Sequence, residues 1–185
     1  MGKFLCADLH LGHKKLVEFD ERMRGTQRPF GHIDDHDSTI IKNINNACSS
    51  ADTLYVLGDV TVNSKHLYLL RQINCNMHLI KGNHDVADPQ MYLKHFYQIS
   101  GCRVFEKFIA THIPIHPREI PRFNVNVHGH LHDQVVKCND GSVDPNYICV
   151  SMEQINYTPI SLEAIESRIM NTVRGKVKGD LSSHP

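Results

Sequence analysis

The sequence lacks tryptophan, net charge and any long apolar run, and each absence excludes a class of protein. Its 185 residues contain no tryptophan, and 20 lysines and arginines balance 20 aspartates and glutamates. A protein that coats nucleic acid through bulk positive charge is therefore not expected, nor one with a long stacking groove for single strands. No apolar run approaches the roughly 20 residues of a membrane-spanning helix, so we expect no membrane contact.

Paired cysteines are also missing. The six cysteines lie far apart and none belongs to a Cys-x-x-Cys pair. This spacing disfavours a thiolate zinc site, and a chain of this length does not need a disulfide framework. The apolar residues before Asp8 are too few for the core of a signal peptide. We therefore expect buried, reduced thiols and a cytoplasmic protein.

Histidine is the residue type present in excess. There are 14 histidines, against 7 phenylalanines and 6 tyrosines. Histidine is the commonest metal ligand and the usual acid–base group near neutral pH. The remaining composition is that of an ordinary globular protein. Its length predicts one domain, over residues 1–174, followed by a polar tail over residues 175–185.

The order of apolar runs predicts an α/β protein. Three runs have the character of buried strands, at 4–9, 53–57 and 77–80. They alternate with helical patterns at 37–48, 64–72 and 88–97, where Asp37 and Asp88 are expected to be N-caps. This alternation is typical of βαβ units with a parallel sheet. Residues 10–36 are expected to form a long loop with a helical turn around 14–22.

The second half is richer in strands. The expected strands are 104–111, 125–128, 134–138 and 147–150, with a hairpin turn at Asn139-Asp140-Gly141. Ser161 is expected to cap a last helix with Ile165 and Ile169 on one face. Together the halves suggest two packed sheets flanked by helices.

Side chains that bind metals follow the ends of these strands. They are Asp8, His10, Asp59, Asn83, His84, Asp85, His112, His130 and His132. In open α/β sheets, ligands bind beyond the carboxyl ends of the strands, so these stretches are expected to meet at one edge. Carboxylate, imidazole and amide groups without a thiolate suit manganese, iron, nickel or zinc in a hydrolytic site.

The same residues form a recognisable series. In order and spacing the chain resembles the calcineurin-like metallophosphoesterases through five motifs: Asp8-Leu9-His10, Gly58-Asp59, Gly82-Asn83-His84-Asp85, His112 and Gly129-His130-Leu131-His132. Gly12-His13-Lys14 and Arg28-Pro29-Phe30 also resemble a small bacterial and phage branch of that family. The Asp-Arg-Gly of the protein Ser/Thr phosphatase branch does not follow Asp59. The resemblance implies an αββα four-layer sandwich, with two mixed β-sheets flanked by helices.

The resemblance also implies a centre with two divalent metal ions. Asp8, His10, Asp59 and His132 would hold the first ion, Asp59 would bridge, and Asn83, His112 and His130 would complete the second. Manganese is favoured, with iron, nickel or zinc as alternatives. A hydroxide bridging the two ions would then attack the phosphorus.

Other residues are expected to act on the substrate. By the resemblance, His84 would protonate the leaving oxygen or stabilise charge on the phosphate, and Asp85 would orient the His84 ring. Arg28 could contact a substrate phosphate, because its planar guanidinium suits bidentate contacts and Pro29 stiffens the chain beside it. His13 could also reach substrate. The alternative for the basic residues of this loop is a solvated, charge-balanced surface.

Two histidines outside the motifs are interpreted differently. His128 alternates with His130 and is interpreted as a structural strand residue. His116 is interpreted as a residue of an ordinary surface loop.

The leading functional hypothesis is a metal-dependent phosphoesterase acting on a small phosphodiester or nucleotide, with diesters favoured over monoesters. The first alternative is a nuclease acting on oligonucleotides or polynucleotides, although the balanced charge does not favour extended nucleic acid as a partner. The second is a non-catalytic metal-binding scaffold, as in relatives of this fold that serve as binding modules. The oligomeric state is left open.

Overall fold

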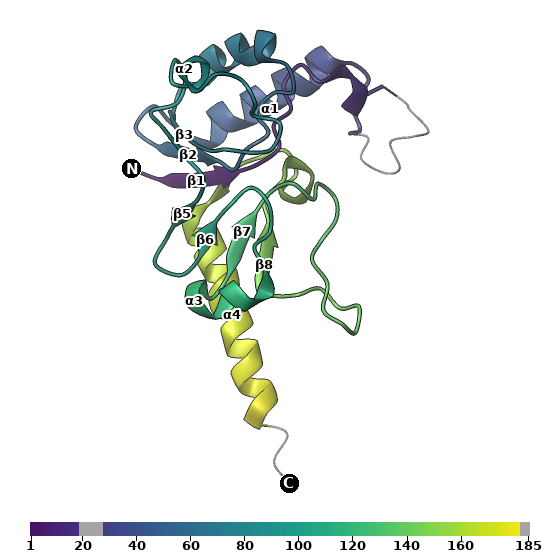
Figure 1. Cartoon of the computed structure of the whole chain (residues 1–185), viewed down its shortest axis with the longest axis vertical. Helices are drawn as coiled ribbons and strands as arrows, with labels where there is room; N and C mark the ends of the chain where they lie inside the picture. Colours follow the sequence, from purple (N-terminus) through teal and green to yellow (C-terminus); the bar gives the residue numbers. More distant parts are fainter. Residues whose placement is uncertain (19–27, 182–185) are drawn as a thin grey trace.

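Two mixed β-sheets form the centre of the protein in a computed structural model that describes residues 1–18 and 28–181, the last ten of these as backbone only. The first sheet has the order β4-β3-β2-β1-β9 and the second the order β5-β6-β7-β8. All neighbours are parallel except β1 with β9 and β5 with β6. Figure 1 shows α1 and α2 on the outer side of the first sheet, and α4 leading away toward the C-terminus.

The strands of the described chain are short. They are β1 (Lys3–Cys6), β2 (Thr53–Val56), β3 (Asn76–Ile80), β4 (Gln98–Ser100), β5 (Arg103–Val104), β6 (Ile109–Ala110), β7 (Asn126–His128), β8 (Tyr147–Cys149) and β9 (Ile160–Ser161). The α-helices are α1 (Ile33–Ala47), α2 (Pro89–Tyr92), α3 (Ile120–Phe123) and α4 (Leu162–Leu181). The 3₁₀ helices are η1 (Lys14–Leu16), η3 (Ser64–Gln72), η4 (Pro117–Glu119) and η5 (Met152–Ile155).

Alternation along β1 gives each face of the first sheet its own core. Leu5 packs into a cluster between the two sheets, where it meets Val127 of β7 and Ile165 of α4. The next residue, Cys6, points to the opposite face and joins a cluster with Ile44 of α1. This alternation follows from the two-residue period of a strand. The expected fold of two mixed sheets with flanking helices is therefore confirmed.

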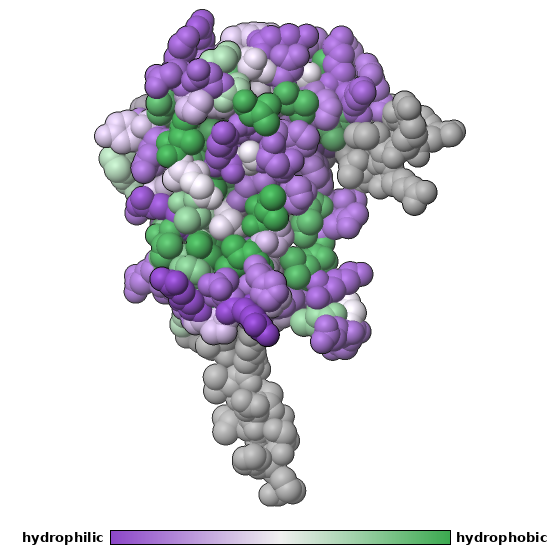
Figure 2. All heavy atoms as spheres, in the orientation of Figure 1, coloured by the Kyte–Doolittle hydropathy of each residue, from purple (hydrophilic) through white to green (hydrophobic). Residues whose placement is uncertain are grey.

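The surface of the protein is mostly polar. Figure 2 shows hydrophilic side chains over most of the visible face, with apolar side chains gathered mainly across its lower half. All six cysteines lie in the described part of the chain and all are free thiols. Among the described residues, no helix has both the length and the apolar character needed to cross a bilayer.

Two helices differ from the sequence-based expectation. The cap of α1 is His32, which accepts a hydrogen bond from the Asp34 N–H, and the helix begins five residues earlier than an N-cap at Asp37 would place it. Asp37 lies instead on the buried face of α1, where its carboxylate accepts the Gly12 N–H at 3.0 and 3.1 Å. Asp88 does cap α2, but the helix ends at Tyr92 rather than near residue 97.

The strands expected at 104–111 and 134–138 also differ. The first is split into β5 and β6 by a tight turn in which the Phe105 N–H donates to the Phe108 carbonyl at 2.8 Å. The second forms only one bridge, between Lys137 and Val143, around the expected turn. A two-stranded hairpin without a further partner is marginal in water, which explains why pairing stops there.

The helical turn expected around 14–22 and the domain boundary expected at residue 174 can be compared with the structure only in part. The turn expected around 14–22 corresponds to η1, and its later part lies among residues 19–27, which are outside the described chain. Helix α4 continues to Leu181, past the expected boundary at residue 174. The tail over residues 175–185 stays a prediction.

Replacement of Ile44 by alanine should destabilise the protein. Ile44 is fully buried where α1 packs on the first sheet, and such deletions cost about 2–5 kcal/mol. Urea unfolding should show a lower midpoint with an unchanged slope. Lys42→Ala on the exposed face of the same helix is the control, and an equal loss in both variants would contradict this packing.

Candidate metal centre

The expected site residues meet because both sheets present the carboxyl ends of parallel strands at one edge. Strands β1, β2 and β3 are parallel in the first sheet, and β6, β7 and β8 are parallel in the second. A bridge between Ala7 and Ser151 joins the two sheets beside the site. The Ala7 N–H donates to the Val150 carbonyl at 2.9 Å, which holds the ends of β1 and β8 together.

A glycine permits this close approach. A Cβ atom at Gly129 would lie 2.5 Å from the Ala7 Cβ and 2.6 Å from the Asp8 Oδ2. Only a residue without a side chain fits between these atoms. The glycine of the Gly129-His130 motif is therefore explained by packing of the two strand ends.

The backbone at the site is unusual as well. Five expected ligands have positive φ, namely Asp8 (59°), His10 (48°), Asp59 (53°), His130 (70°) and His132 (53°). Residues other than glycine adopt this left-handed region infrequently, and it costs of order 1–3 kcal/mol each. Such conformations concentrate at functional sites, since the surrounding fold must impose them.

Asp8, His10 and His132 form the first cluster. One ligand atom from each lies within 4.8 Å of the others. Asp8 Oδ2 accepts hydrogen bonds from the His130 N–H at 2.9 Å and the Ser151 hydroxyl at 2.7 Å. Asp8 Oδ1 is buried and has no hydrogen-bond partner, and the same is true of both ring nitrogens of His10. Of these unpartnered atoms, His10 Nε2 lies 3.9 Å from Asp8 Oδ1 and 3.8 Å from Asp59 Oδ2, where a cation could be bound.

Asp59, His112 and His130 form the second cluster, with one ligand atom from each within 4.8 Å of the others. His112 donates its Nδ1–H to the Leu57 carbonyl at 2.8 Å, so its Nε2 lone pair faces inward. Asn83 Oδ1 lies 2.8 Å from that Nε2 atom. Two acceptors facing each other in this way are what a bound cation would satisfy.

Asp59 lies between the clusters. Its Oδ1 is 3.4 Å from His112 Nε2, and its Oδ2 is 3.8 Å from His10 Nε2. The His84 backbone N–H donates to Asp59 Oδ1 at 2.9 Å, while the half-exposed His84 ring places Nε2 4.0 Å from Asp59 Oδ2. The arrangement therefore suits two cations that share Asp59, with His84 on the open side.

Burial and neighbouring charges shift the titration of these groups. Burial raises the pKa of Asp8 and lowers the pKa of His10 well below its ordinary value. Burial also opposes the charged form of His112, but its hydrogen bond and ion pair with Asp59 raise its pKa overall. The carboxylates thus favour positive charge beside them, and a divalent cation bound by the deprotonated imidazoles would supply that charge.

The chain as a whole matches one known family. The model of the calcineurin-like phosphoesterases matches residues 4–179. The chain belongs to the calcineurin-like phosphoesterase family. This membership makes the protein a metal-dependent phosphoesterase, and it agrees with the two clusters and with the resemblance carried by the five motifs.

The chain is similar to proteins from an archaeon and a phage, and its fold is similar to that of a bacterial protein. An uncharacterized protein of Methanocaldococcus jannaschii is 30% identical over 182 residues, covering 94% of this chain and 93% of its own length. The gene 66 protein of Mycobacterium phage L5 is 31% identical over 108 residues, covering 56% and 49%. The crystal structure of a protein of unknown function from Aquifex aeolicus has a TM-score of 0.63 at 22% identity, covering 90% and 98%, and this likeness concerns the fold.

Asp85 has a different task in this phosphoesterase from the one expected. Its fully buried carboxylate accepts three backbone N–H groups, from Gly82 at 2.8 Å, Asp59 at 2.9 Å and Val60 at 3.0 Å. These bonds tie the loop after β3 to the loop after β2. The structure thus places Asp85 as the link that fixes Asp59, and not beside the His84 ring.

Arg28 also departs from its expected role. It is 1% exposed, and its guanidinium donates to the Asp8 and Leu9 carbonyls and to Glu153 Oε1, the last at 2.9 Å. The same nitrogen that donates to the Leu9 carbonyl, Nη1, also lies 2.8 Å from His36 Nε2. These contacts use the whole guanidinium to hold the backbone at Asp8 and Leu9 and the side chain of Glu153. The Arg28 guanidinium is therefore not directed toward a substrate phosphate.

Of the remaining basic residues of the long loop, the structure describes some and leaves others out. His13 is half-buried, and its ring lies 5.6 Å from the His10 ring, so a role near substrate stays a prediction. Arg22 and Arg24 lie outside the described residues.

The two other histidines occupy the places expected for them. His128 is buried in β7 with Nδ1 2.7 Å from the Gly129 carbonyl. His116 caps η4 by accepting the Arg118 N–H.

Sequence reasoning missed Ser151 and Glu153. Glu153 Oε1 accepts both Arg28 Nε–H and the His132 Nδ1–H, the latter at 2.8 Å. Burial would raise the pKa of Glu153, but the hydrogen bond from His132 and the charge of Arg28 lower it to about 2. Both residues follow β8, so the strand-end rule that identified the other ligands could have found them.

Replacement of Glu153 by alanine should weaken metal binding at the first cluster. A carboxylate that accepts the outer N–H of a ligating histidine fixes the ring, and its loss typically costs about 10–100-fold in metal affinity. Calorimetric titration of metal-stripped protein with Mn²⁺ measures the effect.

Two control variants accompany the Mn²⁺ titration of Glu153→Ala. Glu153→Gln keeps an oxygen acceptor for His132 and should lose less affinity than Glu153→Ala. Glu163→Ala, an exposed change in α4, should bind Mn²⁺ like the wild type. Equal Mn²⁺ affinity in Glu153→Ala and the wild type would contradict the role assigned to Glu153.

Proposed function

We propose that this protein is a two-metal phosphodiesterase that hydrolyses a small phosphodiester or nucleotide. The observation that carries the proposal is the position of Asp59 between two clusters of ligand atoms, with a half-exposed histidine on the open side. Family membership supplies the general activity, and the choice of a diester and of a two-metal mechanism is ours.

The proposed ligands divide as the clusters do. Asp8, His10 and His132 would hold one cation, and Asn83, His112 and His130 the other, with Asp59 shared. When bound, two such cations activate water and neutralise charge on the phosphoryl oxygens. The donor set of imidazole, carboxylate and amide is compatible with Mn²⁺, which we propose as the native metal, and it contains no thiolate that would favour a softer ion.

His84 would then act directly on the substrate. Its ring is 49% exposed, while its backbone N–H is fixed by Asp59, so the imidazole stands at the rim with limited freedom. From there Nε2 can donate a proton to the leaving oxygen or a hydrogen bond to the phosphate. Its separation from Asp59 Oδ2, 4.0 Å, is too long for a direct hydrogen bond and leaves room for a substrate oxygen.

A non-catalytic scaffold is less well supported. Both clusters are present in this chain, and the half-exposed His84 ring stands beside Asp59, where it can contact a substrate. Location in the cytoplasm stays a prediction.

Hydrolysis of two chromogenic substrates tests the proposal. With Mn²⁺, bis-p-nitrophenyl phosphate should be turned over faster than p-nitrophenyl phosphate, and EDTA should abolish both activities. Faster hydrolysis of the monoester would contradict the proposed phosphodiesterase activity and indicate a phosphatase. Failure to hydrolyse either ester, with Mn²⁺ bound, would support the scaffold.

Two variants test the assigned residues. Asp59→Asn should reduce kcat by at least about 10³-fold, because it removes the shared charge, while circular dichroism shows a retained fold. His84→Ala should lower kcat by about 10²–10⁴-fold, the range for general acid–base groups, with Mn²⁺ affinity unchanged. His116→Ala is the matched control on the surface and should retain wild-type kcat.

A further inference from the structure

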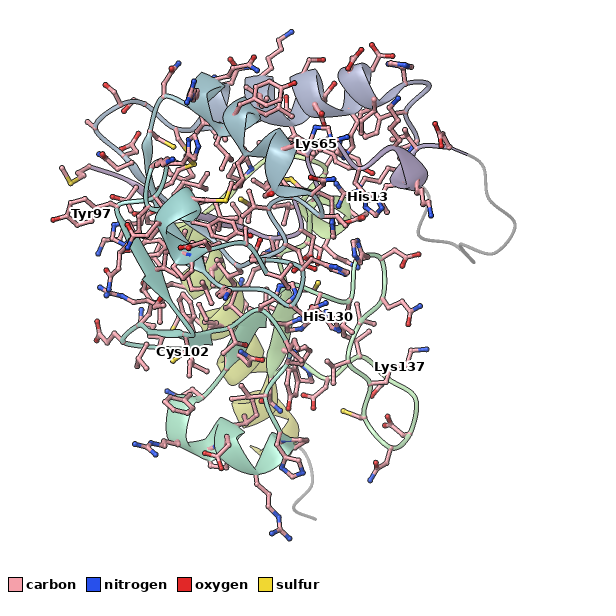
Figure 3. All side chains as sticks on the ribbon, turned by 45° about the horizontal axis from the view of Figure 1, so that its top comes forward. His13, Lys65, Tyr97, Cys102, His130 and Lys137 are labelled. Carbon is pink, nitrogen blue, oxygen red and sulfur yellow. The ribbon has the colours of Figure 1, made fainter. Side chains whose placement is uncertain are left out.

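A basic cavity lies beside the metal centre. It has a volume of about 350 Å³, and its walls include Lys14, Lys15, Lys65, His13 and His66. Figure 3 shows His13 and Lys65 close together on one side of the molecule, with His130 of the second cluster below them. Residues from the start of the long loop and from the segment after β2 therefore enclose one positively charged space.

Among the described residues, the lysines of this cavity have no carboxylate in an ion pair with them. No carboxylate lines the cavity in the described part of the chain, and none of the three lysines forms an ion pair with a described residue. The nearby acids beyond His66 are engaged elsewhere, since Asp37 bonds the Gly12 N–H and His36 and Asp34 pairs with His32. In a chain of zero formal net charge this local excess invites an anion.

The cavity connects with the reacting centre. His13 stands between them, with its ring 5.6 Å from the ring of the ligand His10, and its buried Nδ1 has no hydrogen-bond partner. On the other side, Val62 and Asn63 line both this cavity and a smaller one of about 200 Å³ that includes His84. A substrate held at the cations could thus extend past His84 or His13 toward the lysines.

The floor of the cavity is fixed by the fold. Gly12 has a φ of +74°, and a Cβ atom there would lie 2.3 Å from the His66 ring. The glycine therefore lets the ring of His66 lie directly against the backbone, while the Gly12 N–H is held by Asp37 of α1. Two separate segments are locked together under the lysines, which gives the anion site a defined shape.

We propose that this cavity binds a second phosphate of the substrate, so that the enzyme prefers phosphodiesters that carry a further phosphate group. Lysine ammonium groups bind phosphate as point charges and need no fixed bidentate geometry, which suits a remote phosphate on a flexible link. The inference rests on the proposed phosphodiesterase activity, whose centre would cleave the first phosphate. The second phosphate comes either from a chain end or from the interior of an oligonucleotide.

Matched dithymidylates test this preference. With Mn²⁺, the dinucleotide bearing a 5′- or 3′-terminal phosphate should be cleaved with a kcat/KM at least about tenfold above that of the unphosphorylated dinucleotide. In the triple variant Lys14→Gln, Lys15→Gln, Lys65→Gln this ratio should fall to about one. The ratio, and not the rate alone, is the readout.

A second triple variant controls for total charge. Lys42→Gln, Lys94→Gln, Lys137→Gln removes the same charge from exposed lysines outside the cavity and should keep the wild-type ratio. Lys137, on the loop between β7 and β8, is visibly separate from Lys65 in Figure 3. A ratio lost equally in both triple variants would overturn the site in favour of bulk charge.

Trithymidylate without a terminal phosphate separates the two sources. A gain for trithymidylate over the dinucleotide indicates an interior phosphate and an oligonucleotide substrate, whereas a gain confined to the phosphorylated dinucleotides indicates a terminal phosphate. The absence of a lysine-dependent gain with any of these compounds would overturn the proposal.

Binding measurements keep this inference distinct from the proposed function. Dithymidine with an uncleavable methylphosphonate link, with and without a terminal phosphate, is titrated calorimetrically into the Mn²⁺-loaded protein. Lysine-dependent tightening by the terminal phosphate, without hydrolysis of any diester, would refute the phosphodiesterase and retain the cavity. Hydrolysis of diesters without such tightening or a gain in kcat/KM would refute the cavity alone.

Discussion

The meeting of two sheets at the Ala7–Ser151 bridge is the constraint on which the site depends. This bridge brings the carboxyl ends of β1 and β8 into hydrogen-bonding distance, and Gly129 leaves the space for it. Asp8 then receives hydrogen bonds from His130 and Ser151, which follow β7 and β8 of the second sheet. Without the junction, each sheet would present half of the ligands to solvent, and neither would form a closed set of donors.

The second feature of the site is that its charges are buried before any cation is bound. Asp8 and Asp59 are almost completely inaccessible, and several of the facing nitrogen and oxygen atoms lack partners. Burial of such groups is costly, so the fold supports them from behind. Arg28 and Glu153 connect the backbone of Asp8 with the His132 ring, and Asp85 fixes the backbone of Asp59. This support leaves the ligand atoms pointing at shared spaces, and the strained left-handed backbone of five ligands has the same effect.

Positive charge is placed just outside this centre. The lysines around Gly12 and His66 form no ion pair with a described residue, in contrast to Lys107, which forms an ion pair with Glu166 at 3.1 Å. A balanced overall charge thus conceals a local division, with buried carboxylates in the two ligand clusters and ammonium groups at the neighbouring cavity. Charge counts over a whole chain do not reveal such a division, and the exposed lysines of the expected solvated loop surface line part of an open basic cavity.

The sequence by itself determined the alternation of strands and helices in the first half of the chain, the two-sheet α/β class, and the residues that stand at strand ends. These follow from local physics, because apolar periodicity sets the strands and the side chains directly after them must lie at a sheet edge. Tertiary structure alone decided what Arg28, Asp85 and Glu153 do, and that Asp37 lies inside α1 instead of capping it. Their roles rest on hydrogen bonds across 20 or more residues of chain, from Gly12 to Asp37 and from Arg28 to Glu153, and no local pattern records such a pairing.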